Sequence, residues 1–280
     1  MRRNRLLLVL LTLVLVFTLG NQTTTLAVGD DATETPGVFR IGLEANSAPF
    51  NWSQTTDANG AVPIANSPGE YVNGYDVWMA KRLAEGLGLE LEVQKIEWDG
   101  LVPALQSGKI DAIVAGMSPT AERKLQIDFS GPYYTTDLVI MVTNDSEYLN
   151  ATSLSDFSGT TVSGQLNTLN YNVIDQIDGV NKDTALPDYP TLISALTTDK
   201  IDGFVAEGPA ALAAVASNPQ LTFVRFEEGS GFETSSEDTT VAVGVRKDSP
   251  LTPELNLILD TIPEQERQDA MSQMIDFQTA

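Results

Sequence analysis

The chain has 280 residues, and 38 acidic against 16 basic side chains give it a net charge of −22 at pH 7. A surface of this sign repels nucleic acid and anionic lipid, so neither is an expected partner. His and Cys are absent, which excludes Ser-His-Asp catalysis and disulfide bonds and removes the commonest zinc ligand. The length suffices for two modest α/β domains.

The N-terminus carries the pattern of an export signal. Arg2, Arg3 and Arg5 precede an apolar run over residues 6–19, and a small-residue site lies near Ala27. This pattern predicts a signal peptide over residues 1–27, with an uncleaved anchor as the alternative. The protein is therefore expected in the periplasm or on the outer face of the cell membrane. Residues 28–37 are expected to form a disordered leader.

The elements of a first lobe follow. Residues 38–43 predict a strand, and the polar, turn-rich stretch 52–72 predicts a long hairpin-like loop without a core signal. Asp76 is expected to cap a helix that ends at Gly88, before an alternating strand over residues 89–93. A helix up to Gln106 and a buried strand over residues 110–115 come next. Ser118-Pro119 predicts a further helix, with Ser118 as its cap.

A second lobe is expected to begin after a crossover at residues 134–137. Strands are predicted at residues 138–142, near 161–162 and at 221–226, with a helix after Asn167. An alternating strand at 239–245 and a helix-rich segment at 253–277 then return to the first lobe. We therefore expect lobe 1 over residues 38–135, lobe 2 over 136–238 and the return over 239–280, in an α/β fold whose two mostly parallel, mixed sheets are flanked by helices.

One passage occurs twice. Residues 104–115 recur as residues 195–206, and seven of the twelve paired positions are identical. Each copy has the pattern of a helix end, a polar turn with Lys and a short buried strand. The sequence diverges after the two strands, into Gly116-Met117-Ser118-Pro119 and Glu207-Gly208-Pro209. Because ligands bind beyond the carboxyl ends of strands in open α/β sheets, this predicts two lobes facing one cleft.

An ordered series of motifs closely resembles the family 3 solute-binding proteins, the amino-acid receptors of ABC importers. The motifs lie at residues 74–77, 98–105, 116–124 and 128–130, and the resemblance covers essentially the whole mature chain. It implies the type II periplasmic-binding-protein fold with two hinge crossovers. It further implies a monomer without metal or cofactor, which closes on a free amino acid and delivers it to a transmembrane permease.

The resemblance assigns the two charged ends of an amino acid to opposite lobes. Arg123 would bind the carboxylate, together with Ser118 and the N-terminus of the helix predicted there. Glu207 stands where the family most often has Asp, which contacts the α-ammonium group, and Gly116 would offer a backbone group to the same end. Without the resemblance, a surface ion pair for Arg123 and an exposed loop acid for Glu207 are the simpler interpretations.

Other matched positions form the rest of the expected site. Residues 165–169 resemble a Gly-Thr-Thr-type turn in which Thr168 matches, whereas Asn167 replaces Gly and Leu169 replaces a hydroxyl residue. An anion-binding role for that turn then depends on backbone N–H groups. Phe50 and Trp98 resemble the walls that enclose the ligand side chain, although aromatic residues more often fill cores. Asp76, Asp111 and Asp128 are explained by capping and turn roles.

Ligand choice is expected to depend on Glu44, with a possible contribution from Gln165. A buried carboxylate at Glu44 favours a basic side chain and penalises an acidic one, because an unpaired buried charge is costly. The residues leave a basic amino acid (Lys, Arg, ornithine or His) and Gln open. A cyclohexadienyl dehydratase-like enzyme using Glu207, and the receptor domain of a permease-fused or sensor protein, are the alternative functions; the end of the chain at Ala280 speaks against the fusion.

Overall fold

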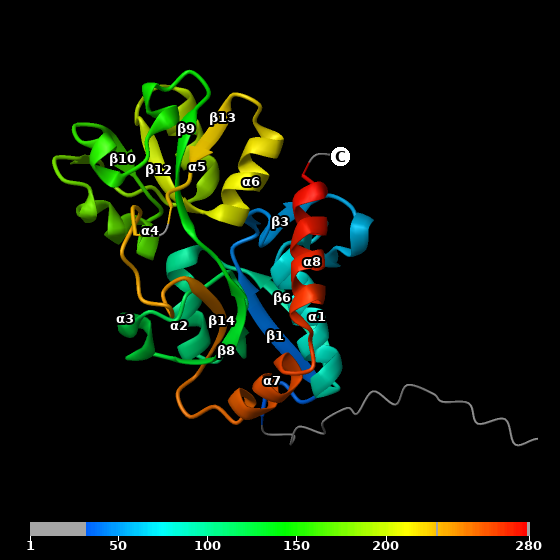
Figure 1. Ribbon diagram of the computed structural model, residues 1–280. Helices are drawn as coiled ribbons and strands as arrows, with labels where there is room; N and C mark the ends of the chain where they lie inside the picture. The colour runs from blue at the N-terminus through cyan, green and yellow to red at the C-terminus, as the bar shows by residue number, and fades with distance from the viewer. Residues whose placement is uncertain (1–31, 228, 279–280) are drawn as a thin grey trace, which may run out of the picture.

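The computed structural model describes residues 32–227 and 229–278. The predicted signal peptide and residues 28–31 of the predicted leader lie outside the described residues. Two five-stranded sheets and one small four-stranded sheet carry the fold (Figure 1), and helices flank the two large sheets. Within the described ranges, no helix is both long and apolar enough to cross a membrane.

The first lobe contains a mixed sheet in the order β6-β1-β7-β14-β8. Its first three strands are parallel, and β14 runs antiparallel to both of its neighbours. Helices accompany this sheet (Figure 1). The strands are β1 (Val38–Leu43), β6 (Glu90–Lys95), β7 (Ala112–Ile113), β8 (Asp128–Thr135) and β14 (Thr240–Val245), and the helices are α1 (Tyr75–Leu87), α2 (Leu101–Gln106), α7 (Leu251–Leu259) and α8 (Glu264–Asp276).

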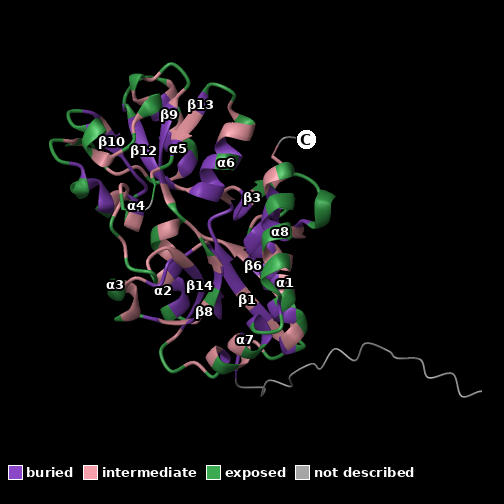
Figure 2. Cartoon of the chain, in the orientation of Figure 1, coloured by how far each residue is buried: buried purple, intermediate pink, exposed green. Residues whose placement is uncertain are grey.

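The second lobe repeats this arrangement, in the order β11-β10-β12-β9-β13. Again three parallel strands are followed by an antiparallel pair. Buried apolar residues form the core around both large sheets, and Figure 2 colours the buried residues purple. The elements are β9 (Leu138–Thr143), β10 (Thr161–Ser163), β11 (Asn181–Lys182), β12 (Gly203–Glu207), β13 (Leu221–Val224), α4 (Leu169–Asn172), α5 (Tyr189–Thr197) and α6 (Gly208–Ser217), with short 3-10 turns η3 (Glu147–Asn150), η4 (Leu154–Phe157) and η5 (Val173–Gln176).

The repeated passage supplies the central strand of each sheet, β7 and β12. Its conserved Asp makes the same pair of bonds in both copies. Asp111 N–H donates to the Arg40 carbonyl over 2.7 Å, and Arg40 N–H donates back to Asp111 Oδ2 over 2.9 Å. Asp202 makes the corresponding bonds with Thr161 over 2.8 and 2.7 Å. This Asp therefore joins the start of the repeated strand to the neighbouring parallel strand, a role more specific than the predicted turn.

The chain crosses between the two sheets twice. It leaves the first sheet between β8 and β9, at residues 136–137, and returns between β13 and β14, at residues 225–239. Helix α8 then runs along the outside of the first lobe as far as α6 of the second (Figure 1), where Ser217 Oγ donates to the Gln278 carbonyl. The two lobes are thus joined by two crossover segments and are in contact at the end of the C-terminal helix.

Three local predictions are wrong. Residues 32–37 of the predicted disordered leader are packed on lobe 1: Ala32 and Thr33 are buried, and Glu34 N–H donates to Asp111 Oδ1 over 2.8 Å. The predicted long hairpin-like loop at 52–72 instead contains most of a small antiparallel sheet. Its strands are short and polar, so they lack the apolar alternation by which a strand is predicted from sequence. It consists of β2 (Asn46–Ser47), β3 (Asn51–Gln54), β4 (Val62–Pro63) and β5 (Tyr71–Asn73), with the 3-10 turn η1 (Ala58–Gly60).

The third error concerns helix starts. Helix α3 spans only Ala121–Lys124, and its cap is Thr120, whose side chain accepts from Arg123 N–H; Ser118 precedes the helix. Likewise α1 begins at Tyr75 after Gly74, so Asp76 lies inside the first turn with its side chain fully buried. Ser and Asp are common cap residues, but the Asp76 side chain binds Asn51 and Tyr133 instead.

Candidate functional site

A small cavity lies between the two lobes. Residues after β1 and β7 form its lobe 1 side, and residues after β10 and at the end of β12 form its lobe 2 side. The cavity therefore lies beyond the carboxyl ends of the central strands, where ligands bind in open α/β sheets. Its lining residues are Ser47, Phe50, Trp98, Ala115, Gly116, Ser118, Arg123, Gln165, Thr168, Leu169, Asn170, Tyr189 and Glu207.

Nine of the ten residues expected in the site line this cavity; the exception, Glu44, lies behind Gln165. Four further lining residues were not anticipated: Ser47, Ala115, Asn170 and Tyr189. Ser47 and Ala115 carry little chemical signal in the sequence. Tyr189 could have been suspected, because it opens a helix just before the second copy of the repeat, but aromatic residues there usually pack in the core.

Arg123 presents the cation of the cavity. Its Nη1 donates to the Ser118 carbonyl over 2.9 Å, and its Nη2 reaches across the cleft to the Asn167 carbonyl over 3.0 Å. The guanidinium carbon lies 5.1 Å from the centre of the Trp98 ring, in cation–π geometry. Burial lowers the pKa of Arg123 to about 10, which still leaves it charged at neutral pH. The four-residue helix α3 is too short to add an anion site of its own, which leaves the guanidinium of Arg123 as the cationic group at the cavity.

Glu207 presents a carboxylate from the opposite lobe. It is the last residue of β12 and precedes α6. The Tyr189 hydroxyl donates to Glu207 Oε2, and Asn170 Nδ2 contacts the same hydroxyl at 3.4 Å. Burial, together with the charge of Glu207, holds the pKa of Tyr189 well above its ordinary value, so the phenol remains a donor. Tyr189 thus fixes the side chain of Glu207 at the cavity wall.

A buried cluster supports Gly116 from behind. Gly116 N–H donates to the Tyr133 hydroxyl over 3.1 Å, and that hydroxyl donates to Asp76 Oδ1 over 2.6 Å. Asn51 Nδ2 donates to the other Asp76 oxygen over 2.7 Å. Burial raises the pKa of Asp76 to about 7, although these donors oppose the rise. Gly116 has φ +63°, and a Cβ there would lie 3.3 Å from the Phe50 ring, which suits glycine at this wall.

Glu44 lies between the lobes with only 4% of its surface exposed. Gln165 Nε2, from lobe 2, lies 3.1 Å from both Glu44 oxygens and from the Pro187 carbonyl. Burial raises the pKa of Glu44 to about 7 despite hydrogen bonds from Gln165 and Asn46. Asn46 Oδ1 is buried without a hydrogen-bond partner. The two lobes therefore enclose a group of acceptors that has fewer donors than it can bind.

The remaining predicted residues have mixed roles. Thr168 Oγ1 accepts from Tyr171 N–H over 3.4 Å and donates to the Gln165 carbonyl over 2.6 Å, so its hydroxyl is used within lobe 2. Thr168 and Leu169 line the cavity at the start of the short helix α4. Phe50 is buried at the cavity wall, and Trp98 covers Arg123 from lobe 1. Both aromatic side chains therefore lie at the cavity.

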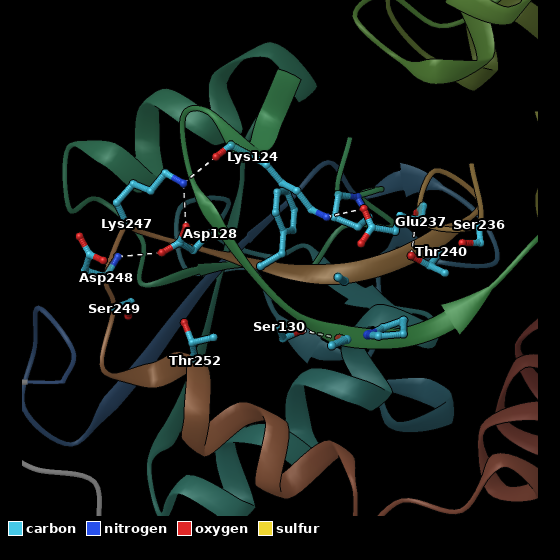
Figure 3. A pocket seen from close by; sticks show the side chains of 15 residues that line it. Lys124, Asp128, Ser130, Ser236, Glu237, Thr240, Lys247, Asp248, Ser249 and Thr252 are labelled. Carbon is cyan, nitrogen blue, oxygen red and sulfur yellow. Dashed lines mark hydrogen bonds and ion pairs between the residues drawn. The ribbon is translucent and has the colours of Figure 1, made fainter. Parts of the chain in front are cut away.

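A second, more open hollow lies on lobe 1 beside β8 and β14 (Figure 3). Lys247 Nζ lies 2.7 Å from Asp128 Oδ1, and Lys124 Nζ lies 2.6 Å from Glu237 Oε2. Four of its five charged side chains are thus paired with one another on a partly exposed surface, where such pairs are weak. None of the ten expected site residues lines it, and we take the interlobe cavity as the candidate site.

Comparison with known proteins gives consistent results. An arginine-binding extracellular protein of Bacillus subtilis, ArtP, is 32% identical over 210 residues, which cover 70% of this chain and 75% of that protein. A probable histidine-binding protein of Campylobacter jejuni is 30% identical over 200 residues, or 69% of this chain and 70% of that protein. The crystal structure of the substrate-binding protein AbpA from Streptococcus pneumoniae, bound to L-arginine, is similar with a TM-score of 0.73 and 25% identity, covering 87% of this chain and 97% of that chain.

The family model for bacterial extracellular solute-binding proteins, family 3, matches residues 39–274. That span includes both large sheets, both crossovers and every residue of the candidate site. The expected resemblance and the two-lobe α/β fold are therefore confirmed, and the chain belongs to the bacterial extracellular solute-binding proteins of family 3.

Proposed function

We propose that this protein is an exported receptor that binds one cationic L-amino acid, with arginine the best fit, and delivers it to an ABC permease as a monomer. The observation that carries the proposal is the placement of Arg123 and Glu207 on opposite lobes around one cavity. A free amino acid has an anionic and a cationic group on the same carbon. Only a ligand with both groups satisfies both walls when the lobes close.

Glu44 supports the choice of a cationic side chain. A cation that reached this carboxylate would replace the Gln165 amide and would neutralise a charge that burial disfavours. A guanidinium has five N–H donors, compared with two for a carboxamide. It could therefore serve Glu44, the Pro187 carbonyl and the unpaired Asn46 Oδ1 together. Two of the relatives described above are named for arginine and histidine, which have basic side chains.

The proposal is tested with purified protein by thermal shift against the twenty amino acids and ornithine, followed by calorimetry. We expect L-arginine to raise the Tm most, since a ligand at 100 times its Kd stabilises the folded state by about 2.7 kcal/mol. Arg123→Ala and Glu207→Gln should each abolish most of the shift. Absence of a shift with every amino acid would refute the receptor function. Loss of prephenate or arogenate on incubation with the protein would favour the enzyme instead.

A further inference from the structure

Asn167, in lobe 2, makes several hydrogen bonds to lobe 1 at the mouth of the cleft. Its carbonyl accepts from Arg123 Nη2 over 3.0 Å and from Trp98 Nε1 over 3.4 Å. Its side-chain Nδ2 donates to Asp99 Oδ1 over 2.8 Å. Asn167 of lobe 2 is thus hydrogen-bonded to three side chains that belong to lobe 1. These bonds can form only when the lobes are closed.

The backbone of Asn167 is left-handed, with φ +57°. A non-glycine residue in this region is uncommon, and glycine adopts it without a steric cost. Asn is among the residues that tolerate the conformation best, but glycine has no side chain to reach Asp99. The bond to Asp99 gives a physical reason for Asn here, and the left-handed turn directs the Asn167 carbonyl at Arg123.

We infer that Asn167 is a positioning residue that clasps the lobes shut by holding Asp99 and orienting Arg123. The inference rests on the proposed binding function, because closure matters only if a ligand is enclosed. The clasp consists of the side-chain bond to Asp99 and the two carbonyl bonds to Arg123 and Trp98. The Asn167 and Asp99 side chains are exposed, whereas Arg123 and Trp98 are half-buried, so the side-chain bond in particular makes a modest contribution in water.

Asn167→Gly separates the parts of the clasp. It keeps the carbonyl and suits the positive φ, but it removes the bond to Asp99. Asp99→Ala removes the same bond from the other lobe. We expect each variant to bind L-arginine about two- to tenfold more weakly than the parent, with faster dissociation. Because both substitutions remove the same bond, the double variant should bind no more weakly than the single variant with the lower affinity. Asn150→Gly, at an exposed site of lobe 2 that lines no cleft surface, is the matched control.

Interlobe distance gives a readout that does not depend on affinity. Because the chain has no Cys, nitroxide labels can be attached to cysteines at the exposed residues Glu85 in lobe 1 and Asp145 in lobe 2. Pulsed electron–electron double resonance then measures the distances between the two labels, with and without L-arginine, and these distances give the fraction of closed molecules. The clasp predicts a smaller closed fraction in Asn167→Gly and in Asp99→Ala than in the parent and in Asn150→Gly.

The possible results separate the clasp from the proposed function. An unchanged closed fraction in both clasp variants would overturn the inference, as would a parent protein that never closes. Additive effects of the two substitutions would also overturn it, because then the residues do not act on each other. If L-arginine leaves the parent's distances and Tm unchanged, the arginine proposal fails, whereas the ligand-free closed fractions of the variants still decide the clasp.

Discussion

Glu44 makes the affinity for a cationic amino acid depend on pH. Its carboxyl is buried, and its pKa is raised from 4.5 to about 7. Only the ionised form can pair with a ligand cation, so protons compete with the ligand below that pKa. The apparent Kd is then multiplied by about 1.1 at pH 8, about 2 at pH 7 and about 11 at pH 6. We expect L-arginine to bind about tenfold more weakly at pH 6 than at pH 8, a loss of about 1.4 kcal/mol.

The assay is isothermal titration calorimetry at pH 6, 7 and 8. At pH 7, repetition in buffers of different ionisation enthalpy should reveal about half a proton released for each ligand bound. Glu44→Gln is the matched variant, since it keeps the size of the side chain and removes its charge. It should bind arginine about 100-fold more weakly at pH 8, because a buried ion pair loses one partner, and its Kd should vary little with pH. A parent Kd that stays constant from pH 6 to pH 8 would refute the reasoning.

Three further predictions concern the supports of the site. Tyr189→Phe should weaken arginine binding about fivefold with little loss of Tm, because it removes the donor that fixes Glu207; calorimetry that finds equal affinity would contradict this role. Gly74→Ala should lower the free energy of unfolding, measured in urea, by about 3 kcal/mol or more, because Gly74 has φ +132° and a Cβ there would lie 2.2 Å from the Phe50 carbonyl oxygen. The control is Gly69→Ala, which should cost about 1 kcal/mol, because Gly69 has φ +91° but a Cβ there would meet no other atom. Burial raises the pKa of Asp76 to about 7, so this residue should contribute stability that is present in acid and is lost as the pH rises through 7. The free energy of unfolding should therefore fall by about 3 kcal/mol between pH 4.5 and pH 7.5 on account of Asp76. In Asp76→Asn, measured over the same range, this fall should be absent.

The sequence predicted which residues meet at the interlobe cavity better than it predicted the helices beside them. Nine expected residues line one cavity because a motif records which side chains are present in which order, and the fold brings the ends of its central strands together. The start of α3 was misplaced because Ser118 has the chemistry of a cap, yet Thr120 takes that role. Propensity cannot decide between two nearby hydroxyl residues, whereas the packing around them can.

Tyr189 and Asp76 show a second limit of the sequence. Each could be explained by an ordinary role, as a core aromatic or as a helix cap. In the structure, Tyr189 binds Glu207, and Asp76 supports Gly116 through Tyr133. Tyr189 is 18 residues from its partner, and Asp76 and Tyr133 are 57 residues apart. No local pattern encodes such pairs, because their contact depends on how strands are ordered in the sheet.

By itself the sequence determined the acidic, cysteine-free composition, the repeated strand and the two opposite charges that follow its copies, since periodicity and residue type are local properties. Its repeated Asp was visible too, but only the structure showed that Asp111 and Asp202 bind equivalent neighbouring strands. Tertiary structure alone decided which groups meet across the cleft: Gln165 on Glu44, and Asn167 on Arg123 and Asp99. These contacts depend on the relative position of two lobes, which is set by packing and hinge geometry over the whole chain rather than by any one segment.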